Sequence, residues 1–505
     1  MSVEKKASNS EAQPGVPAQQ SGGGDAGGDS RGSGCEKGFS HQESTRLPHE
    51  ATDAVSLQRS ASHEPRWRTV LCFLLMLAAI QLVLGPKLRL SQWGAEAESN
   101  AAVAEGVAWQ HGRLDIPHKE GADLLHERMH DTAYFNGKVY NAFPPMFSLL
   151  TFLISPAMEF FGVREGLWLT VPYVQLVFWP LPIVGFIVFR RQVGDSAWAA
   201  LLTLGWIGGT ALLPNLHECQ TGYLGQIDHV LSQVGLLIFA ADLIGRRRIW
   251  PALIGLAIST YTRQLTFLYA LPLLWMVWRQ GHKRLLACAI GLFIVAAPLL
   301  LLNWLKFGNP LEFGYRYIYA GRESEYMGGR AMTYGIFSTH FIPENSYYMF
   351  VAPPAIDVSS TQIYIHDTNP NGTSLWLTTP LAIFAVVFAA WWWRDKSRRL
   401  LMLGTLPVLF GLLCYHSPGY MEIGYNRFAL DFLPIWLVVI APRTRNGWRT
   451  WFTIVCTAWS LLYFQAIVPD SPTLKPTPRM KAKETMPSAS MPASSMRPND
   501  AAGIR

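Results

Sequence analysis

The chain has 505 residues, of which 50% are hydrophobic, 12% aromatic and only 15% charged, whereas a globular domain carries roughly 25% charged residues. This deficit of charge argues against a soluble domain and predicts an integral membrane protein. The net charge of +7 does not indicate a nucleic-acid partner, because the basic residues form short clusters between apolar runs, as in cytoplasmic loops. These clusters are Arg190–Arg191, Arg246–Arg248, Lys283–Arg284, Arg394–Arg399 and Arg443–Arg449.

Two polar segments flank the apolar part of the chain. Residues 1–64 are rich in Gly, Ser, Gln and charge, a composition that cannot bury enough apolar surface to offset the entropy of ordering. We predict a disordered cytoplasmic head there, without a signal peptide. Residues 469–505 are predicted to form a disordered tail, and residues 65–468 the membrane domain.

The first membrane helix is expected from about Trp67 to Leu84, since a bilayer core of roughly 30 Å requires about 20 apolar residues. Arg66 and Arg68 precede this run and place the N-terminus in the cytoplasm. Ten more apolar runs predict an all-α polytopic protein of 11 to 13 membrane helices. The runs lie near residues 146–161, 168–189, 196–213, 227–245, 250–278, 285–305, 375–393, 400–415, 428–441 and 450–468.

Two of these runs do not fit a simple series of crossings. The run 250–278 is too long for one span and has Arg263 at its centre, so we predict two short helices that meet on the outer side. Arg66 and Arg190 both have a cytoplasmic signature, yet three runs separate them. Either the run 146–161 does not cross fully, or prolines divide the run 168–189.

Large loops are expected on the outer face over residues 87–143 and about 306–374, and a shorter loop precedes the run 428–441. All three are rich in carboxylates, arginines and tyrosines. In the first loop, residues 97–110 have helical spacing, and we predict two short helices on the membrane surface. Arg263 and Asp431 lie within or beside apolar runs, where a charge is costly unless it is paired or faces a cavity. A salt bridge between helices is the structural alternative for both.

The segment HDTAYFNGKVYNAFPPMFSLL, residues 130–150, is the most informative part of the sequence. Asn136-Gly137 indicates a turn, and Pro144-Pro145 indicates an extended entry into the next helix. Strand or coil, turn and membrane entry are therefore expected in this order. Asp131, Lys138 and Tyr140 would lie at the interface, unless the segment is a simple anchoring turn.

Several segments in chain order resemble the GT-C superfamily of polytopic membrane glycosyltransferases, the group that includes the protein O-mannosyltransferases. They are GAEAESNAAVAEGVAWQHGRLDI, the segment 130–150, GLAISTYTRQLTFLYALP, FGNPLEFGYRY and GYNRFALDFLP. The resemblance covers most of residues 67–441 in pieces. It differs from the family pattern at one position, because Glu96 stands where the first outer loop usually has an aspartate.

The resemblance implies an inverting transfer of a sugar from a polyprenyl-phosphate donor to an extracytoplasmic glycan, lipid or protein, in a bacterial inner membrane. An acid of the first loop would act as the general base, which contributes roughly 10²–10⁴-fold to such reactions. The expected catalytic residues are Glu96, Glu98 and Asp131. The expected substrate-binding residues are His130, Lys138, Tyr140, Arg263, Arg316 and Arg427.

Two other classes of protein remain possible from the sequence. A transporter or lipid flippase would need polar groups near the bilayer midplane and usually repeated halves, and the sequence shows no internal repeat. A non-enzymatic assembly factor would account for the head and tail but not for the polar outer loops. The loop acids could bind a divalent metal, but no ligand spacing argues for one. The enzyme hypothesis requires Glu96 or Glu98 to lie near Arg263, Arg316 or Arg427.

Overall fold

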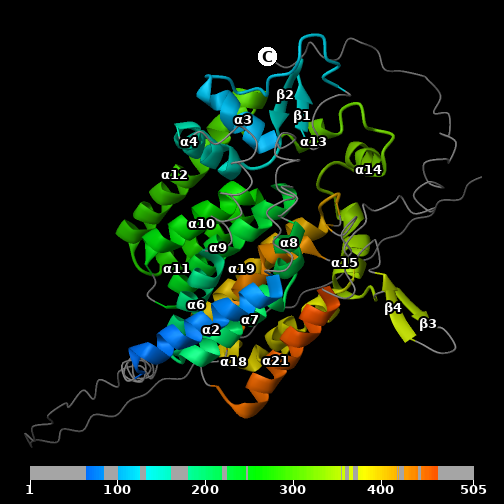
Figure 1. Ribbon diagram of the computed structural model, residues 1–505. Coiled ribbons are helices and arrows are strands. Elements are labelled where there is room, and N and C mark those ends of the chain that lie inside the picture. Colours follow the sequence, from blue (N-terminus) through cyan, green and yellow to red (C-terminus); the bar gives the residue numbers. More distant parts are fainter. Residues whose placement is uncertain are drawn as a thin grey trace, which may run out of the picture. The chain divides into compact units, whose positions relative to one another are not determined.

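The computed structural model (Figure 1) describes residues 64–84, 101–125, 132–160, 180–218, 224–245, 248–353, 355–358, 363–367, 373–417, 419, 426–441 and 445–464. These residues are mostly helical, in agreement with the predicted helical class. The predicted head, apart from residue 64, and the predicted tail lie outside the described residues.

Two described helices are long and apolar enough to cross a membrane: α2 (Arg66–Leu84) and α12 (His282–Phe307). Only 11% of the apolar window of α2 and 28% of that of α12 is buried, so both helices present apolar side chains outward. Four further apolar helical segments of the described chain have only 10 to 17 residues. The 11 to 13 spans predicted from the sequence are therefore not established by helix length.

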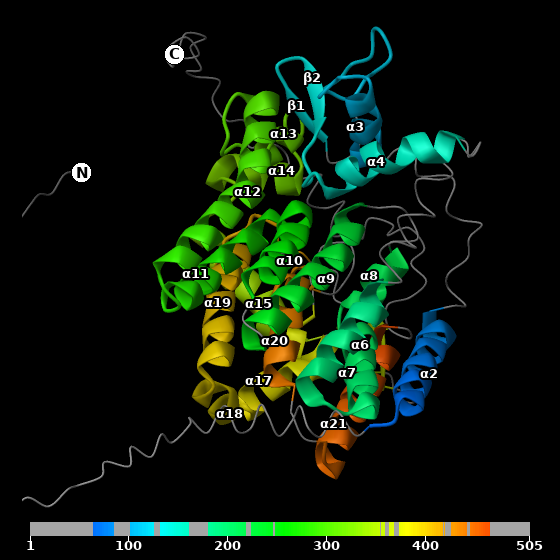
Figure 2. The same ribbon diagram turned by 90° about the vertical axis from the view of Figure 1, so that its left-hand side faces the viewer.

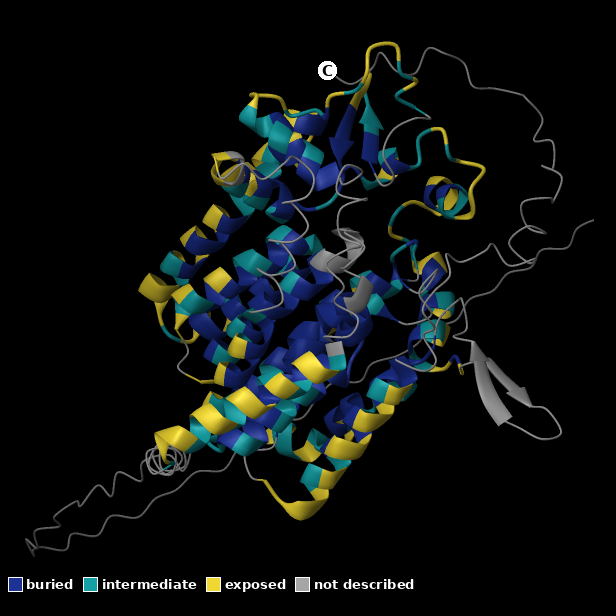
Figure 3. Ribbon diagram, in the orientation of Figure 1, coloured by how far each residue is buried: buried dark blue, intermediate teal, exposed yellow. Residues whose placement is uncertain are grey.

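Many residues of the outer helices are exposed (yellow in Figure 3), and they include many large apolar residues. Soluble monomers rarely expose large contiguous apolar patches. Several exposed tryptophans lie beside the basic clusters, an arrangement typical of the boundary between a membrane and water. They are Trp67, Trp250, Trp275, Trp278, Trp393, Trp448 and Trp451.

Among the described helices, α9 (Leu224–Ile244) and α10 (Ile249–Thr262) make the most extensive contact. Gly235 and Gly255 allow this approach, because a Cβ atom on Gly235 would lie 2.4 Å from the Gly255 carbonyl oxygen. Four helices pack against this pair: α6 (Pro180–Val193), α8 (Leu212–Glu218), α19 (Lys396–Leu413) and α20 (Leu433–Ile440). Further out, α7 (Ser196–Gly208) packs against α6, and α21 (Gly447–Leu462) packs against α7.

The run 250–278 is broken at Arg263, as predicted. Helix α10 ends at Thr262, Arg263 is extended (φ −143°, ψ 93°), and the chain continues as the 3₁₀ helix η5 (Gln264–Tyr269) and helix α11 (Ala270–Trp278). The polar residues at the centre of the run therefore end one helix and begin another.

The apolar run 375–393 does not form one continuous helix. It is divided into α16 (Leu375–Thr378), η7 (Pro380–Ala382), α17 (Ile383–Val387) and α18 (Ala389–Arg394). The first break follows from Pro380, because a residue that precedes proline is disfavoured in the α conformation.

The predicted turn at Asn136-Gly137 is confirmed. Strands β1 (Thr132–Phe135) and β2 (Lys138–Asn141) form an antiparallel hairpin, and Asn136 and Gly137 have positive φ angles of 50° and 74°. An Asn-Gly pair with two positive φ angles matches the twist of a two-residue hairpin. Helix α3 (Ala101–Gln110) precedes the hairpin and is the one helix described in the first loop.

Polar contacts join the start of α2 to the end of α6. Ser196 Oγ donates to Glu64 Oε2 at 2.7 Å, and Arg190 Nη2 lies 3.7 Å from the same oxygen. Helix α2 therefore begins where α6 ends. Helix α4 (Met146–Phe160) packs along α3 instead (Figure 2).

The loop 306–374 has structure of its own, which the helical prediction did not anticipate. It contains a second hairpin of β3 (Ala355–Val358) and β4 (Ile363–Asp367). It also contains the short helices α13 (Tyr315–Ile318), α14 (Tyr326–Tyr334), η6 (Thr339–Phe341) and α15 (Ile342–Phe350).

The α9–α10 contact predicts a steric effect. Gly235→Ala should lower the free energy of unfolding in detergent by about 1–3 kcal/mol, the usual cost of overpacking. Gly447→Ala is the matched control, because a Cβ atom there meets nothing within 4 Å. Equal stability of the two variants would contradict the close approach.

Candidate functional site

A buried ion pair joins two breaks in the helical chain. Arg263 Nη2 lies 3.0 Å from Asp431 Oδ2, and Arg263 Nε lies 3.2 Å from both oxygens of the same carboxylate. Asp431 is fully buried and the Arg263 side chain is 16% exposed. The interhelical salt bridge that the sequence left open is therefore present.

Local backbone structure explains why these two residues meet. Arg263 directly follows the end of α10, and Asp431 ends the 3₁₀ helix η8 (Arg427–Asp431) just before α20. The Asn426 side chain accepts a hydrogen bond from the Ala429 backbone at 3.0 Å and so begins η8. Tyr269 donates to the Asp431 carbonyl at 2.9 Å.

Helix α9 adds an acid and a histidine to this pair. His229 Nδ1 lies 3.3 Å from Asp431 Oδ1, and His229 is fully buried. The neighbouring Asp228 is 1% exposed and interacts electrostatically with Arg263 and Asp431. Its carboxylate accepts no hydrogen bond from the described residues. A buried carboxylate in this state is costly, and such groups mark functional sites in apolar surroundings.

A second guanidinium contacts the same aromatic ring as Arg263. The Arg263 and Arg427 guanidinium carbons are 5.1 and 5.5 Å from the centre of the Phe428 ring, within the range of cation–π attraction. The His229 ring centre is 5.6 Å from that of Phe428. Arg263 is neutralised by Asp431, whereas Arg427 makes no ion pair within the part of the chain described, and its buried Nε has no hydrogen-bond partner there. We call Asp228, His229, Arg263, Arg427 and Asp431 the central cluster.

Residues of the long outer loop adjoin this cluster. Tyr315 donates to Gln264 at 3.2 Å, next to Arg263 in sequence. Tyr319 and His416 Nε2 are 2.7 Å apart, and Arg330 donates to the His416 carbonyl at 3.1 Å. Burial lowers the pKa of His416 to about 4, so this imidazole is neutral near pH 7.

A second buried ion pair fastens the first outer loop to α12. Glu105 on α3 is fully buried, and its Oε1 lies 2.5 Å from Lys306 Nζ. Ser148 and the Asn141 side chain donate to its other oxygen at 2.6 and 3.1 Å. Lys306 also donates to the Asn141 carbonyl at 3.1 Å. One carboxylate therefore connects α3, β2, α4 and α12.

The predicted catalytic residues Glu96, Glu98 and Asp131, and the predicted binding residue His130, lie outside the described residues. The structure therefore does not test their proximity to the arginines.

The structure does not bring the remaining predicted binding residues to one site. Arg263 and Arg427 belong to the central cluster. Arg316 pairs with Glu312 at 2.8 Å, with its side chain 58% exposed. Lys138 is also exposed and lies 3.7 Å from Asp115. Tyr140 is buried against Phe307, with ring centres 5.5 Å apart, and burial raises its pKa. These contacts show anchoring of the hairpin and loop.

Sequence reasoning missed Asp228, His229, Glu105 and Lys306 as members of buried clusters. The signal for the first two was present, because Asp228-His229 stands at the start of an apolar run, where ionisable residues are uncommon. Glu105 and Lys306 are 201 positions apart, and no local pattern indicates that they pair.

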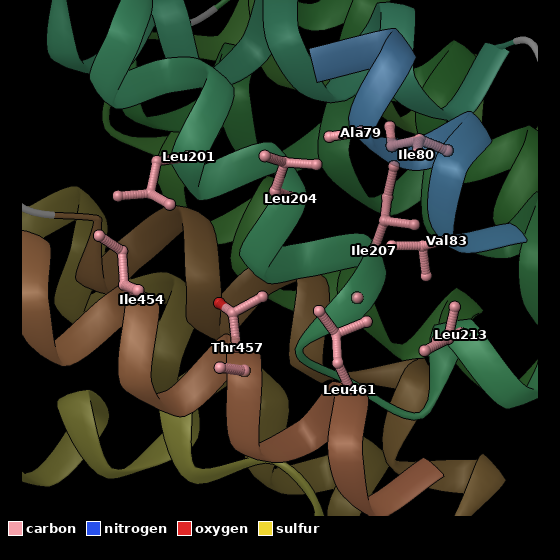
Figure 4. A pocket seen from close by; sticks show the side chains of 12 residues that line it. Ala79, Ile80, Val83, Leu201, Leu204, Ile207, Leu213, Ile454, Thr457 and Leu461 are labelled. Atoms are coloured by element: carbon pink, nitrogen blue, oxygen red, sulfur yellow. The ribbon is translucent and has the colours of Figure 1, made fainter. Parts of the chain in front are cut away.

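A cavity of about 220 Å³ lies elsewhere, between α2, α7 and α21 (Figure 4). Thr457 is the one hydroxyl-bearing residue among its twelve lining residues, and none is ionisable. This cavity offers no group for acid–base or phosphate chemistry, so the central cluster is the better candidate site.

The described residues contain no group of three or more His, Cys, Asp or Glu side chains that could hold a metal ion. In comparisons with known proteins, no family model matches the chain, and no curated protein or solved structure is significantly similar to it.

Breaking the buried Glu105–Lys306 pair should affect stability more than breaking the exposed Lys138–Asp115 pair. Glu105→Gln should lower the free energy of unfolding by about 3–5 kcal/mol, because Lys306 would remain buried without a counter-charge. Lys138→Gln breaks an exposed pair and should cost about 0–1 kcal/mol. Chemical denaturation in detergent measures both, and a similar loss in the two variants would contradict the buried anchor.

Proposed function

We propose that the chain is a multi-pass inner-membrane glycosyltransferase. It moves a sugar from a polyprenyl-phosphate donor to an extracytoplasmic glycan, lipid or protein, with inversion at the anomeric carbon. The exposed apolar helices and the tryptophans beside basic clusters support the membrane location. The outer loops adjoining the central cluster support a reaction at the membrane surface.

The observation that carries this proposal is the guanidinium of Arg427, which has no counter-charge among the described residues and shares the Phe428 ring with Arg263. The planar guanidinium fork matches phosphate oxygens. A fixed cation in a site with little water stabilises the charge that develops on a departing phosphate. Arg427 is therefore assigned to the donor phosphate, while Asp431 holds Arg263 in place.

In the proposed reaction, the acceptor hydroxyl oxygen forms a bond to the anomeric carbon as the bond from that carbon to the phosphate oxygen breaks. The phosphate leaves with the bonding electron pair. A first-loop acid takes the hydroxyl proton, with Glu96, Glu98 and Asp131 as the candidates. Tyr140 is not assigned to the sugar, because its ring packs against Phe307.

A transporter is the second candidate, and one observation favours it. The helix break at Arg263 and the break before α20 place buried charges at discontinuous helices, a feature of substrate sites in many transporters. A transporter would move its substrate without forming a glycosidic bond, so product analysis separates the two candidates.

Mass spectrometry of cell-envelope glycans tests the transferase proposal. Arg427→Gln should reduce the product by about 100-fold, the usual effect of removing one donor to a developing anion. Arg316→Gln is the matched control, since Arg316 pairs with Glu312 at the surface, and it should leave the product unchanged. Glu96→Gln and Glu98→Gln test the base separately.

The proposal fails if a well-expressed Arg427→Gln protein yields the normal glycan. Normal glycans in Glu96→Gln, Glu98→Gln and Asp131→Asn variants would instead remove the first-loop acids from the mechanism.

A further inference from the structure

A short backbone pairing joins the long outer loop to the loop that follows α19. Phe337 and Tyr415 form an isolated antiparallel bridge, and the backbone N–H of His416 donates to the Ile336 carbonyl at 2.9 Å. The Asn345 side chain donates to the Tyr415 carbonyl at 2.8 Å. We call the pairing of Ile336 and Phe337 with Tyr415 and His416 the loop junction. It connects two outer loops that are far apart in sequence.

The His416 side chain is buried at this junction, with 1% of its surface exposed. Its Nε2 lies 2.7 Å from the Tyr319 hydroxyl, whereas its Nδ1 is buried and has no hydrogen-bond partner among the described residues. A neutral imidazole has one N–H, which Nε2 can donate to Tyr319. Protonation would add an N–H at Nδ1 that no described group accepts, and an unsatisfied buried donor is costly. The local hydrogen bonding therefore fits the neutral ring.

The charged groups around His416 also oppose a positive imidazole. Arg330 on α14 donates to the His416 carbonyl at 3.1 Å, and Glu344 on α15 is already paired with Arg330 at 2.6 Å. The other titratable groups that contact the ring within the described chain are Tyr319 and Tyr415, whose phenols are uncharged near pH 7. Burial, assisted by Arg330, therefore lowers the pKa of His416 from 6.5 to about 4.

The loop junction places aromatic rings against the central cluster. The ring centre of Tyr415 lies 5.6 Å from that of Phe428, the ring that Arg263 and Arg427 share. Tyr315 from the long outer loop packs on Tyr415 with ring centres 6.3 Å apart. One ring from each outer loop therefore meets at the aromatic group that contacts both guanidinium groups of the candidate site.

We propose that His416 is a positioning residue: as a neutral imidazole it holds the two outer loops together beside the central cluster, and its protonation opens the loop junction. Opening withdraws Tyr315 and Tyr415 from Phe428 and so lowers transfer. The effect on transfer rests on the proposed function. The opening itself does not, because it is a property of the two loops, and the two claims can fail separately.

The direction of the pH dependence follows from the lowered pKa of His416. The closed junction binds the proton more weakly than the open one, in which the imidazole regains its ordinary pKa of 6.5. Closure is therefore fully favoured above pH 6.5 and is lost progressively as the pH falls toward 4. Between these limits, the ratio of open to closed junction should rise about fivefold from pH 6.5 to about pH 5.5.

Hydrogen exchange of the full-length protein in detergent, followed by mass spectrometry, measures the junction through local opening. The reporter is the peptide that contains the His416 amide, with its rate corrected for the pH dependence of intrinsic exchange. In the wild-type protein its protection should fall about fivefold from pH 6.5 to about pH 5.5. In His416→Gln it should stay constant, because the amide can donate to Tyr319 but takes no proton. His340→Gln is the matched control, since His340 is an exposed histidine of the long outer loop, and it should behave as the wild type.

Protection of the wild-type junction that does not change with pH would overturn the proposal, and this result needs no variant. A loss of protection at low pH that persists in His416→Gln would also overturn it, because another group would then carry the titration.

The effect on transfer is read from cell-envelope glycans of cells grown near neutral pH and at about pH 5.5. The product should fall at the lower pH in the wild type and in His340→Gln but not in His416→Gln. An equal fall in all three would remove His416 from the positioning of the site. A normal glycan in Arg427→Gln, together with a junction that opens at low pH, would contradict the transferase proposal and leave the role of His416 in the loops intact.

Discussion

The Arg263–Asp431 ion pair is the contact on which the arrangement of the helical interior depends. It joins the end of α10 to the start of α20, and His229 on α9 lies against the same carboxylate. Neither charge is tolerable alone in apolar surroundings, because removing one partner of a buried pair costs several kcal/mol. The pair therefore fixes the register of three chain segments that are far apart in sequence. Asp228 interacts electrostatically with both members of this pair, and Arg427 shares the Phe428 ring with Arg263.

The Glu105–Lys306 pair likewise fixes the position of the first outer loop relative to α12. Its carboxylate is shared by Lys306, Ser148 and Asn141, so the first loop is anchored to the end of α12 by a buried ion pair and hydrogen bonds rather than by apolar packing alone. Satisfied buried networks specify one arrangement, because alternatives would leave a charge unpaired. Together, the two ion pairs explain how segments rich in polar residues are held at defined positions beside apolar helices.

Local features of the fold could be predicted from the sequence, whereas long-range ones could not. The break at Arg263 and the Asn136-Gly137 turn each follow from a few neighbouring residues. The hydropathy of the run 375–393 does not show its division into short helices, although Pro380 is a local signal for the first break. Arg263 and Asp431 were singled out because charge in or beside an apolar run is costly, whereas Arg427 was expected only from the family resemblance. The ring that Arg263 and Arg427 share, Phe428, and the neighbouring Asp228 depend on tertiary contacts that no single sequence displays.

A double-mutant cycle on the central ion pair tests this account most directly. Arg263→Met, Asp431→Leu and the double variant would be compared by their free energies of unfolding in detergent. Each single variant should lose about 3–5 kcal/mol, and the double variant should regain most of that loss, because it leaves no uncompensated buried charge. Additive losses, with no coupling between the two sites, would contradict the account.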